Sequence, residues 1–249
     1  MKYAIIGDIH GTELKDLETV LDYENPDVII CTGDFDQTRS IHQFMNLERK
    51  YTDAGKKVIK VPGNHDHAIL NNLPITSGAL VMQGKTIWQL HEELNNDPAA
   101  KKYISDLVNS NNRVKIFLDK ERFSKTYQTI IIHGAYDGNL RSFPDCPPEI
   151  EDLWIRLLTL DDCKKNFRVM DIEGDKIMIR GHDHNAIYIY EDPDEGIIVN
   201  EPKIDMSAYK LYKHRKHIIN PGALFDGLFA IINTGVPGEE LPILKYLRV

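Results

Sequence analysis

Short apolar segments rich in β-branched residues recur along the chain, and each ends at a polar turn. They lie at residues 3–6, 28–31 and 58–61. Continuous apolar runs of this length indicate strands that are buried on both faces. Between them, residues 14–21 and 40–54 place apolar side chains at helical spacing. The alternation predicts a β-α-β-α-β unit with mostly parallel strands and right-handed crossovers.

Composition and charge narrow the class of protein. The chain of 249 residues contains no Gly/Ser or Pro tract typical of a linker, so we expect one domain over residues 1–249. Its three cysteines lack zinc-type spacing, and no run reaches membrane-spanning length. These features favour a soluble cytoplasmic protein that does not contact membranes. The net charge of −8 argues against bulk nucleic-acid binding.

Residues with metal-ligand chemistry follow five predicted strands. In open α/β sheets, ligands bind beyond the carboxyl ends of the strands. The members of each Asp-x-His or His-x-His pair are two residues apart, and in extended backbone such side chains point the same way. The complete set is Asp8, His10, Asp34, Asn64, His133, His182 and His184.

Seven oxygen and nitrogen donors are more than one ion needs. Two divalent ions that share Asp34 would use all of them. Imidazole and carboxylate donors without thiolate suit Mn, Fe, Co, Ni or Zn. In two-metal sites the ions lie about 3.5–4 Å apart and activate a water for in-line displacement. The residues therefore predict hydrolysis at phosphorus by a hydroxide that bridges two metal ions.

The order of these blocks resembles the calcineurin-like metallophosphoesterase family. The family pattern is Asp-x-His, Gly-Asp, Gly-Asn-His-Asp/Glu, a later His and Gly-His-x-His, and all five blocks occur between residues 7 and 184. The resemblance implies a first metal at Asp8, His10, Asp34 and His184 and a second at Asp34, Asn64, His133 and His182, with Mn as the favoured ion. It also implies that His65 contacts the phosphoryl group and protonates the leaving oxygen. We expect Asp66 to orient His65 through a hydrogen bond.

The family also implies a four-layer α-β-β-α sandwich of two mixed sheets flanked by helices. Five segments in the carboxyl-terminal third have the length and composition of short strands, with Asp-Pro-Asp-Glu-Gly at 192–196 and Asn-Pro-Gly at 220–222 as turns. We expect these segments to form a second, largely antiparallel sheet. They are residues 186–190, 197–200, 217–219, 228–232 and 243–247.

Departures from the family pattern bear on the substrate. Members that hydrolyse phosphoproteins or diadenosine tetraphosphate usually carry Gly-Asp-x-x-Asp-Arg-Gly and Gly-Asn-His-Glu. Here residues 33–39 read Gly-Asp-Phe-Asp-Gln-Thr-Arg, and the second block ends in Asp66. Both differences, with Asn-Pro-Gly-Ala at 220–223, favour the small prokaryotic phosphodiesterase branch.

The expected function is therefore a dinuclear-metal phosphoesterase that hydrolyses phosphodiester or phosphomonoester bonds of a small phosphoester or nucleotide. The alternatives are a dinucleoside polyphosphate hydrolase, a protein phosphatase or a partner-binding scaffold on the same fold.

In two stretches the chain is longer than a minimal member of the family. Residues 84–112 predict two short helices that break at Asn95-Asn96, with Asp97 as the N-cap of the second. Residues 135–167 predict a Pro-rich loop and an amphipathic helix carrying Leu153, Trp154, Leu157 and Leu158. A lid role is a hypothesis for both. The candidate substrate contacts are Arg39, Tyr136 and Arg141.

Overall fold

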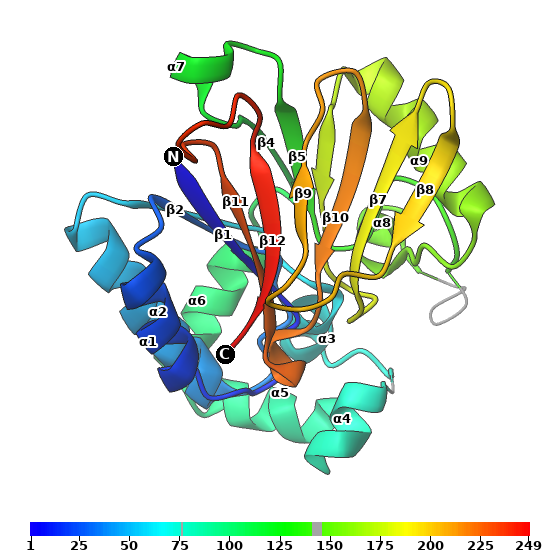
Figure 1. Cartoon of the computed structure of the whole chain (residues 1–249). Coiled ribbons are helices and arrows are strands. Elements are labelled where there is room, and N and C mark those ends of the chain that lie inside the picture. The colour runs from blue at the N-terminus through cyan, green and yellow to red at the C-terminus, as the bar shows by residue number, and fades with distance from the viewer. Residues whose placement is uncertain (76, 141–145) are drawn as a thin grey trace.

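Two six-stranded sheets pack face to face at the centre of the molecule (Figure 1). The computed structural model describes residues 1–75, 77–140 and 146–249. The strands of the first sheet, in spatial order, are β3 (Lys57–Lys60), β2 (Val28–Cys31), β1 (Lys2–Ile6), β11 (Leu228–Asn233), β12 (Ile243–Arg248) and β9 (Ala208–Lys210). Those of the second are β4 (Arg113–Phe117), β5 (Gln128–Ile132), β6 (Ile177–Ile179), β10 (Lys216–Pro221), β7 (Ala186–Asp192) and β8 (Gly196–Asn200).

The parallel amino-terminal unit forms as the hydrophobic pattern predicts. Strand β1 pairs with β2, and β2 with β3, both in parallel. All four residues of β2 are buried, as a continuous apolar run requires. Helices α1 (Lys15–Glu24) and α2 (Thr38–Asp53) make the crossovers. These connections bring the carboxyl ends of β1, β2 and β3 to one edge.

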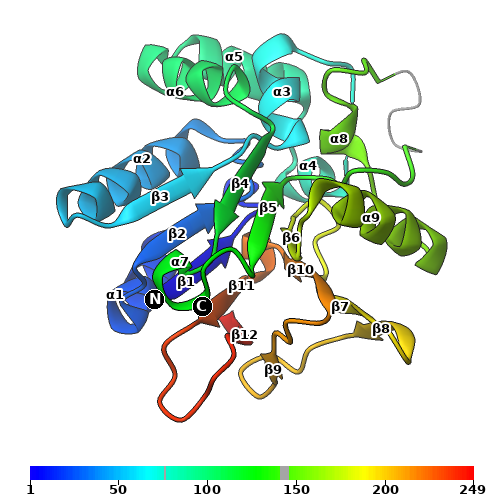
Figure 2. The same ribbon diagram turned by 90° about the horizontal axis from the view of Figure 1, so that it is seen from above.

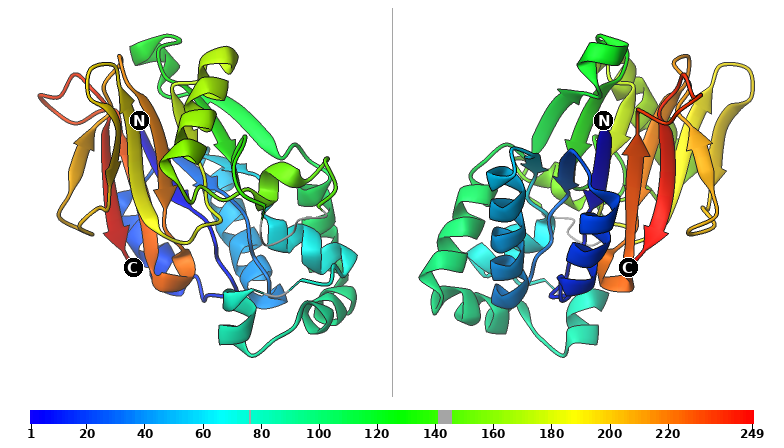
Figure 3. Two further views of the ribbon diagram at one scale, coloured as in Figure 1. Left: turned by 90° about the vertical axis from the view of Figure 1, so that its right-hand side faces the viewer. Right: turned by 60° about the vertical axis from the view of Figure 1, so that its left-hand side comes forward.

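Three of the five carboxyl-terminal strands, β7, β8 and β10, join the second sheet as expected, but the expectation was wrong for β11 and β12, which join the first sheet. Strand β11 pairs antiparallel with β1, whereas β10 pairs in parallel with β6. The amino-terminal unit leaves one edge of β1 unpaired, and backbone groups there need partners within the buried core. Strand β11 supplies those partners for β1, and β10 likewise pairs with the open edge of β6 in the other sheet. The carboxyl-terminal third is therefore divided between the two sheets (Figure 3).

The four-layer sandwich is confirmed by three apolar clusters. One lies between the sheets and includes Ile5, Ile30, Ile131 and Ile179. A second packs α1, α2, α3 (Asn64–Asn71), α5 (Ile87–Asn95) and α6 (Pro98–Val108) on the outer face of the first sheet. A third packs α9 (Leu160–Glu173) on the outer face of the second sheet. Viewed from above, helices flank both sheets (Figure 2).

The two helices expected within 84–112 are present. Helix α5 begins after Thr86, and α6 begins after Asp97, whose side chain accepts a hydrogen bond from the backbone N–H of Ala100. Their apolar faces contribute Leu90 and Ile104 to the cluster on the first sheet. A short helix, α4 (Gly78–Gln83), precedes them.

The helix expected around Leu153–Leu158 was wrong in its extent. Helix α8 (Glu151–Trp154) ends after four residues, and the chain continues in extended form. Thr159 then caps α9 in a capping box with Asp162, which starts a new helix at residue 160. The other short helices are α7 (Lys120–Phe123) and the 3-10 helix η1 (Leu224–Asp226). No helix within the described ranges is long and apolar enough to cross a membrane.

Candidate metal centre

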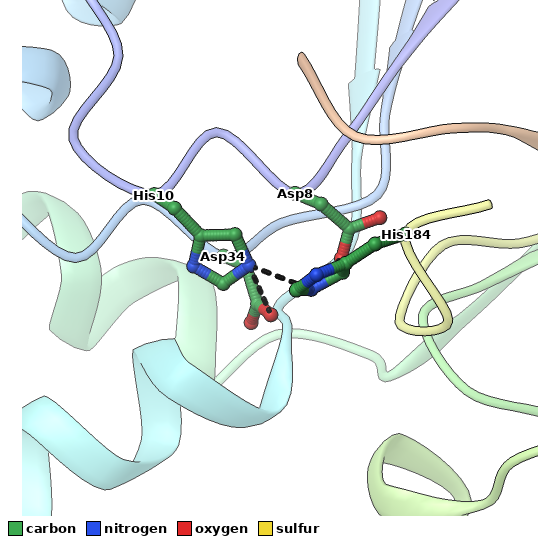
Figure 4. Close-up of side chains that lie close together, drawn as sticks. All are labelled: Asp8, His10, Asp34 and His184. Carbon is green, nitrogen blue, oxygen red and sulfur yellow. Dashed lines mark hydrogen bonds and ion pairs between the residues drawn. The ribbon is translucent and has the colours of Figure 1, made fainter. Parts of the chain in front are cut away.

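The seven predicted donors converge where the carboxyl ends of five strands meet. Two follow β1, one follows β2, one begins α3 after β3, one follows β5 and two follow β6. Figure 4 shows four of them, Asp8, His10, Asp34 and His184, facing a common centre. All seven residues but His184 are buried.

The loops that carry these donors adopt left-handed backbone. Asp8 and His10 have φ values of 50° and 43°, and His182 and His184 have 71° and 61°. The expected extended backbone was therefore wrong, although each pair does face the centre. Positive φ is uncommon for residues other than glycine, and such strain concentrates at functional sites.

One group of donors matches the first metal set. Nε2 of His10 lies 2.9 Å from Nε2 of His184 and 3.6 Å from Oδ2 of Asp34. Nε2 of His184 lies 3.7 Å from Oδ1 of Asp8. The ligand atoms of these four residues all lie within 4.8 Å of one another, a separation that one divalent ion can bridge.

A second group adjoins the first and shares Asp34 with it. Oδ1 of Asn64 lies 2.8 Å from Nε2 of His133 and 2.9 Å from Nδ1 of His182. Nε2 of His133 lies 3.3 Å from Oδ2 of Asp34. The carboxylate of Asp34 therefore stands between the two groups.

The tautomers of two histidines fit a cation at this centre. Nδ1 of His133 lies 2.6 Å from the carbonyl oxygen of Thr32, which can only accept, so Nδ1 donates. In neutral His133 the lone pair is then on Nε2, facing the carbonyl oxygen of Asn64. Nδ1 of His10 likewise lies 2.8 Å from Oδ2 of Asp36, which leaves its Nε2 to face His184. When His133 is neutral its lone pair faces the acceptor of Asn64, and a divalent ion between them would take the place of the proton that otherwise joins them. Outer hydrogen bonds of this kind orient metal-binding histidines.

The charges at the centre shift the pKa values of its histidines. Burial disfavours the imidazolium of His10, but Asp36, Asp34 and Asp8 outweigh this and raise its pKa to about 10. Burial, with His133 and two arginines nearby, holds the pKa of His182 well below its usual range. Asp34 is buried, yet His133 and His65 keep its pKa well below the ordinary value. The centre thus holds anionic carboxylates in a buried setting, which favours cations.

His65 lies beside the metal-ligand groups, on α3. Its Nδ1 lies 2.7 Å from Oδ1 of Asp36, and its backbone N–H donates to Oδ1 of Asp34 at 2.9 Å. The expectation that Asp66 hydrogen-bonds His65 was wrong, because consecutive residues on a helix do not face each other. Asp36, two residues beyond Asp34 in the chain, holds this position instead.

Comparison with known proteins agrees with this geometry. The model of the calcineurin-like phosphoesterase family matches residues 1–186. The chain belongs to this family. Calcineurin-like phosphoesterases are metal-dependent hydrolases of phosphoric esters, and the converging donors form the corresponding candidate metal centre.

A curated relative and two solved structures extend the comparison. The relative, a probable cyclic nucleotide phosphodiesterase of Vesicomyosocius okutanii, is 24% identical over 230 residues, which cover 88% of this chain and 91% of the relative. A metallophosphoesterase from Sphaerobacter thermophilus superimposes with a TM-score of 0.65 at 20% identity, over 99% of this chain and 88% of that one. A hypothetical protein of Pyrococcus horikoshii OT3 gives a TM-score of 0.57 at 12% identity, over 100% and 87% of the two chains. At these identities the two structures support the fold.

In this calcineurin-like phosphoesterase Asp66 binds backbone. Its carboxylate accepts hydrogen bonds from the backbone N–H groups of Asp34, Phe35 and Gly63 at 3.0, 3.0 and 2.8 Å. Burial, reinforced by the charge of Asp34, raises its pKa to about 6. Asp66 therefore fixes the loop that carries Asp34 to the start of α3.

Gly63 permits this close approach. A Cβ at Gly63 would lie 2.0 Å from Oδ1 of Asp34 and 2.6 Å from its backbone nitrogen. Only glycine lets the two loops meet at this distance.

Two of the three expected substrate contacts, Arg39 and Tyr136, do not line the cavity at the metal centre. Arg39 is 62% exposed and forms an ion pair with Glu13. The hydroxyl of Tyr136 donates to Asp175 at 2.7 Å, and Asp175 precedes β6, at the edge of the sheet opposite the metal centre. Neither residue is among those that line the cavity at the centre. Arg141 lies outside the described residues.

A cavity of about 600 Å³ opens onto the metal centre. Asp34, Asn64, His65, His182 and His184 lie in its polar part. Its walls come from the segment around α4, from residues 154–158 and from η1. Sequence reasoning did not single out Arg156, Met82 or Phe225, which line these walls, because no motif marks them.

Proposed function

We propose that this phosphoesterase hydrolyses phosphodiester bonds of small phosphoester or nucleotide substrates with two divalent transition-metal ions. The observation that carries the proposal is the convergence of both donor groups on Asp34, with the buried His65 at their edge. Asp8, His10, Asp34 and His184 would hold one ion, and Asp34, Asn64, His133 and His182 the other. When bound, the ions would supply Lewis-acid stabilisation of the phosphoryl oxygens and a water of lowered pKa.

The chain itself supplies the proton for the leaving group in this proposal. Nδ1 of His65 is engaged by Asp36, so Nε2 is the nitrogen that can serve the cavity. Although burial opposes the charged form, Asp36 and Asp34 raise the pKa of His65. A protonated Nε2 would donate to the leaving oxygen as the P–O bond breaks.

Two observations support the diester preference. The curated relative carries the name probable cyclic nucleotide phosphodiesterase. The chain also lacks the Arg-Gly that follows the second Asp in the phosphoprotein and diadenosine tetraphosphate pattern, since Gln37 and Thr38 stand there. Imidazole, carboxylate and amide donors without thiolate fit several divalent transition metals, and among these we favour Mn as the ion that membership of the family implies.

The test compares bis-p-nitrophenyl phosphate with p-nitrophenyl phosphate under added Mn, Ni or Zn. We expect a higher kcat/KM for the diester. His65→Ala should abolish turnover. His214→Ala should not, because the side chain of His214 is 59% exposed and is distant in sequence from the donors. A preference for the monoester would contradict the diester assignment, and full activity of His65→Ala would contradict the role of His65.

A further inference from the structure

One arginine that lines the cavity has no side-chain partner in the part of the chain that the structure describes. Nε of Arg156 is buried, and among the described residues no hydrogen bond or ion pair engages its guanidinium. Arg156 is also the one lysine or arginine among the described residues that line the cavity. Arg156 is half-buried as a residue, yet a nitrogen that is shielded from water ordinarily has a hydrogen-bond partner, because an unpaired buried polar group is costly.

The backbone of Arg156 is fixed to Asn139, and its two neighbours are fixed to the segment that carries His182 and His184. The N–H and C=O of Arg156 pair with those of Asn139 at 3.0 and 3.1 Å. On either side, the carbonyl of Ile155 accepts from Arg180 and the N–H of Leu157 donates to Asp183. The guanidinium therefore stands at a set place beside the metal centre, where its charge contributes to the lowered pKa of His182.

The neighbouring Arg180 shows what a structural arginine looks like here. Its Nε donates to the carbonyl of Gly134 at 2.7 Å, its Nη1 pairs with Asp183, and its Nη2 donates to Ile155 at 3.2 Å. Each of its three guanidinium nitrogens has a partner, whereas the guanidinium of Arg156 has none among the described residues and can bind a ligand. A guanidinium in this position suits a phosphoryl oxygen.

Most of the remaining side chains that line the cavity are apolar. Met82 of α4 is 71% exposed and Leu158 is 50% exposed, and both line the cavity together with Phe225 of η1. Exposed apolar side chains that gather around a polar floor are typical of small-molecule sites. One carboxylate, Asp226, also lines the cavity and disfavours substrates with several phosphates.

From these contacts we infer that Arg156 binds the phosphoryl group of the substrate while Met82, Leu158 and Phe225 contact its organic part, so that the substrate is a single-phosphate diester with an aromatic or nucleoside group. This inference rests on the proposed function and adds the residues that select the substrate. Arg156 contacts the substrate without serving as proton donor.

The first test removes the positive charge of Arg156. Arg156→Met should raise the KM for bis-p-nitrophenyl phosphate roughly 10- to 100-fold and weaken binding of inorganic phosphate to the Mn-loaded enzyme by a similar factor, as expected for a lost charged hydrogen bond. Arg156→Lys should recover part of both. Arg168→Met, at an exposed arginine of α9, is the matched control and should change neither.

The second test uses two neighbouring exposed residues of α4. Met82 lines the cavity, whereas Val81, which is 75% exposed, does not. Met82→Ser should lower the preference for bis-p-nitrophenyl phosphate over methyl p-nitrophenyl phosphate several-fold, and Val81→Ser should leave it unchanged.

The outcomes separate this inference from the proposed function. Unchanged KM and phosphate affinity in Arg156→Met would overturn the role of Arg156 while diester hydrolysis stands. Equal effects of Met82→Ser and Val81→Ser would overturn the apolar contact. Absence of diester turnover in the wild type would count against the proposed function and the diester assignment, whereas calorimetry with phosphate would still test the role of Arg156.

Discussion

Asp36 and His65 form a buried pair in which Oδ1 of the carboxylate lies 2.7 Å from Nδ1 of the imidazole. The other carboxylate oxygen lies 2.8 Å from Nδ1 of His10 and accepts from the side chain of Gln83 at 2.9 Å. One side chain thus orients both a candidate metal ligand and the candidate proton donor. Burial opposes its ionisation, yet the two histidines lower the pKa of Asp36 far below the ordinary value.

Asp36→Asn should therefore impair catalysis. An amide can accept from only one of the two imidazoles and presents an N–H to the other, which forces a different tautomer. We expect kcat to fall roughly 10- to 100-fold, as is typical when the outer partner of a metal-binding histidine is lost. Gln83→Leu removes only one donor and should cost less. Steady-state kinetics with bis-p-nitrophenyl phosphate would reveal this, and an unchanged kcat in Asp36→Asn would refute the role of the pair.

Asp66→Asn should act chiefly on stability. The amide replaces one oxygen that accepts backbone N–H groups, so at least one buried donor loses its partner. The expected loss is about 1–3 kcal/mol of unfolding free energy. Urea unfolding of the metal-free protein measures it, with Asp161→Asn on the exposed first turn of α9 as the control. Equal midpoints for the two variants would contradict the structural role of Asp66.

Metal removal should destabilise the fold as well as stop turnover. The donors follow strands of both sheets, so bound ions would link β1 and β2 to β5 and β6. A ligand present at a thousand times its dissociation constant stabilises by about 4 kcal/mol. Thermal melting with Mn and with a chelator tests this, and Asp34→Asn should narrow the difference. Identical curves for the wild type would argue against metal binding.

A buried histidine outside the site should make the fold acid-sensitive. His217 is fully buried between the hydroxyl of Tyr188 and the carbonyl of Tyr212. Burial, despite the carbonyl, lowers its pKa to about 4. Because the unfolded chain takes up this proton near the ordinary pKa of 6.5, stability present above pH 6.5 is lost as the pH falls to about 4.

The size of this effect follows from the shift, which corresponds to up to about 3 kcal/mol. Urea midpoints between pH 7 and pH 4 should fall less steeply in His217→Gln than in the wild type. His214→Gln, at an exposed histidine, should follow the wild type. Parallel slopes in all three proteins would show that His217 does not titrate in this range.

The metal ligands could be predicted because each follows a strand, and strand ends are visible as the end of an apolar run. Asp36 could not be preferred over Asp66 in this way. Both are close to the site in sequence, and the choice depends on the direction of side chains on α3 and on the left-handed backbone at Asp36, where φ is 62°. No sequence motif marks Arg156, because the argument for its role depends on the lack of side-chain partners among the described residues.

The hydrophobic pattern also did not indicate how the carboxyl-terminal strands are divided between the two sheets. Antiparallel strands of similar composition fit either sheet by their periodicity. Which sheet they join is decided by the inner edges of β1 and β6, and those edges are defined only once the sheets have formed.

Strand β1 lies between β2 and β11, and residues 2–5 pair with residues 230–233. More than 200 residues of chain separate the two partners. Closing so long a loop costs conformational entropy before the contacts that stabilise it have formed. Contacts of this range therefore slow folding. Asp8 and His10 directly follow β1, so the strand that carries these two donors is enclosed on both sides only when this long-range pairing has formed. During synthesis, β1 can pair with β11 only after nearly the whole chain has been made.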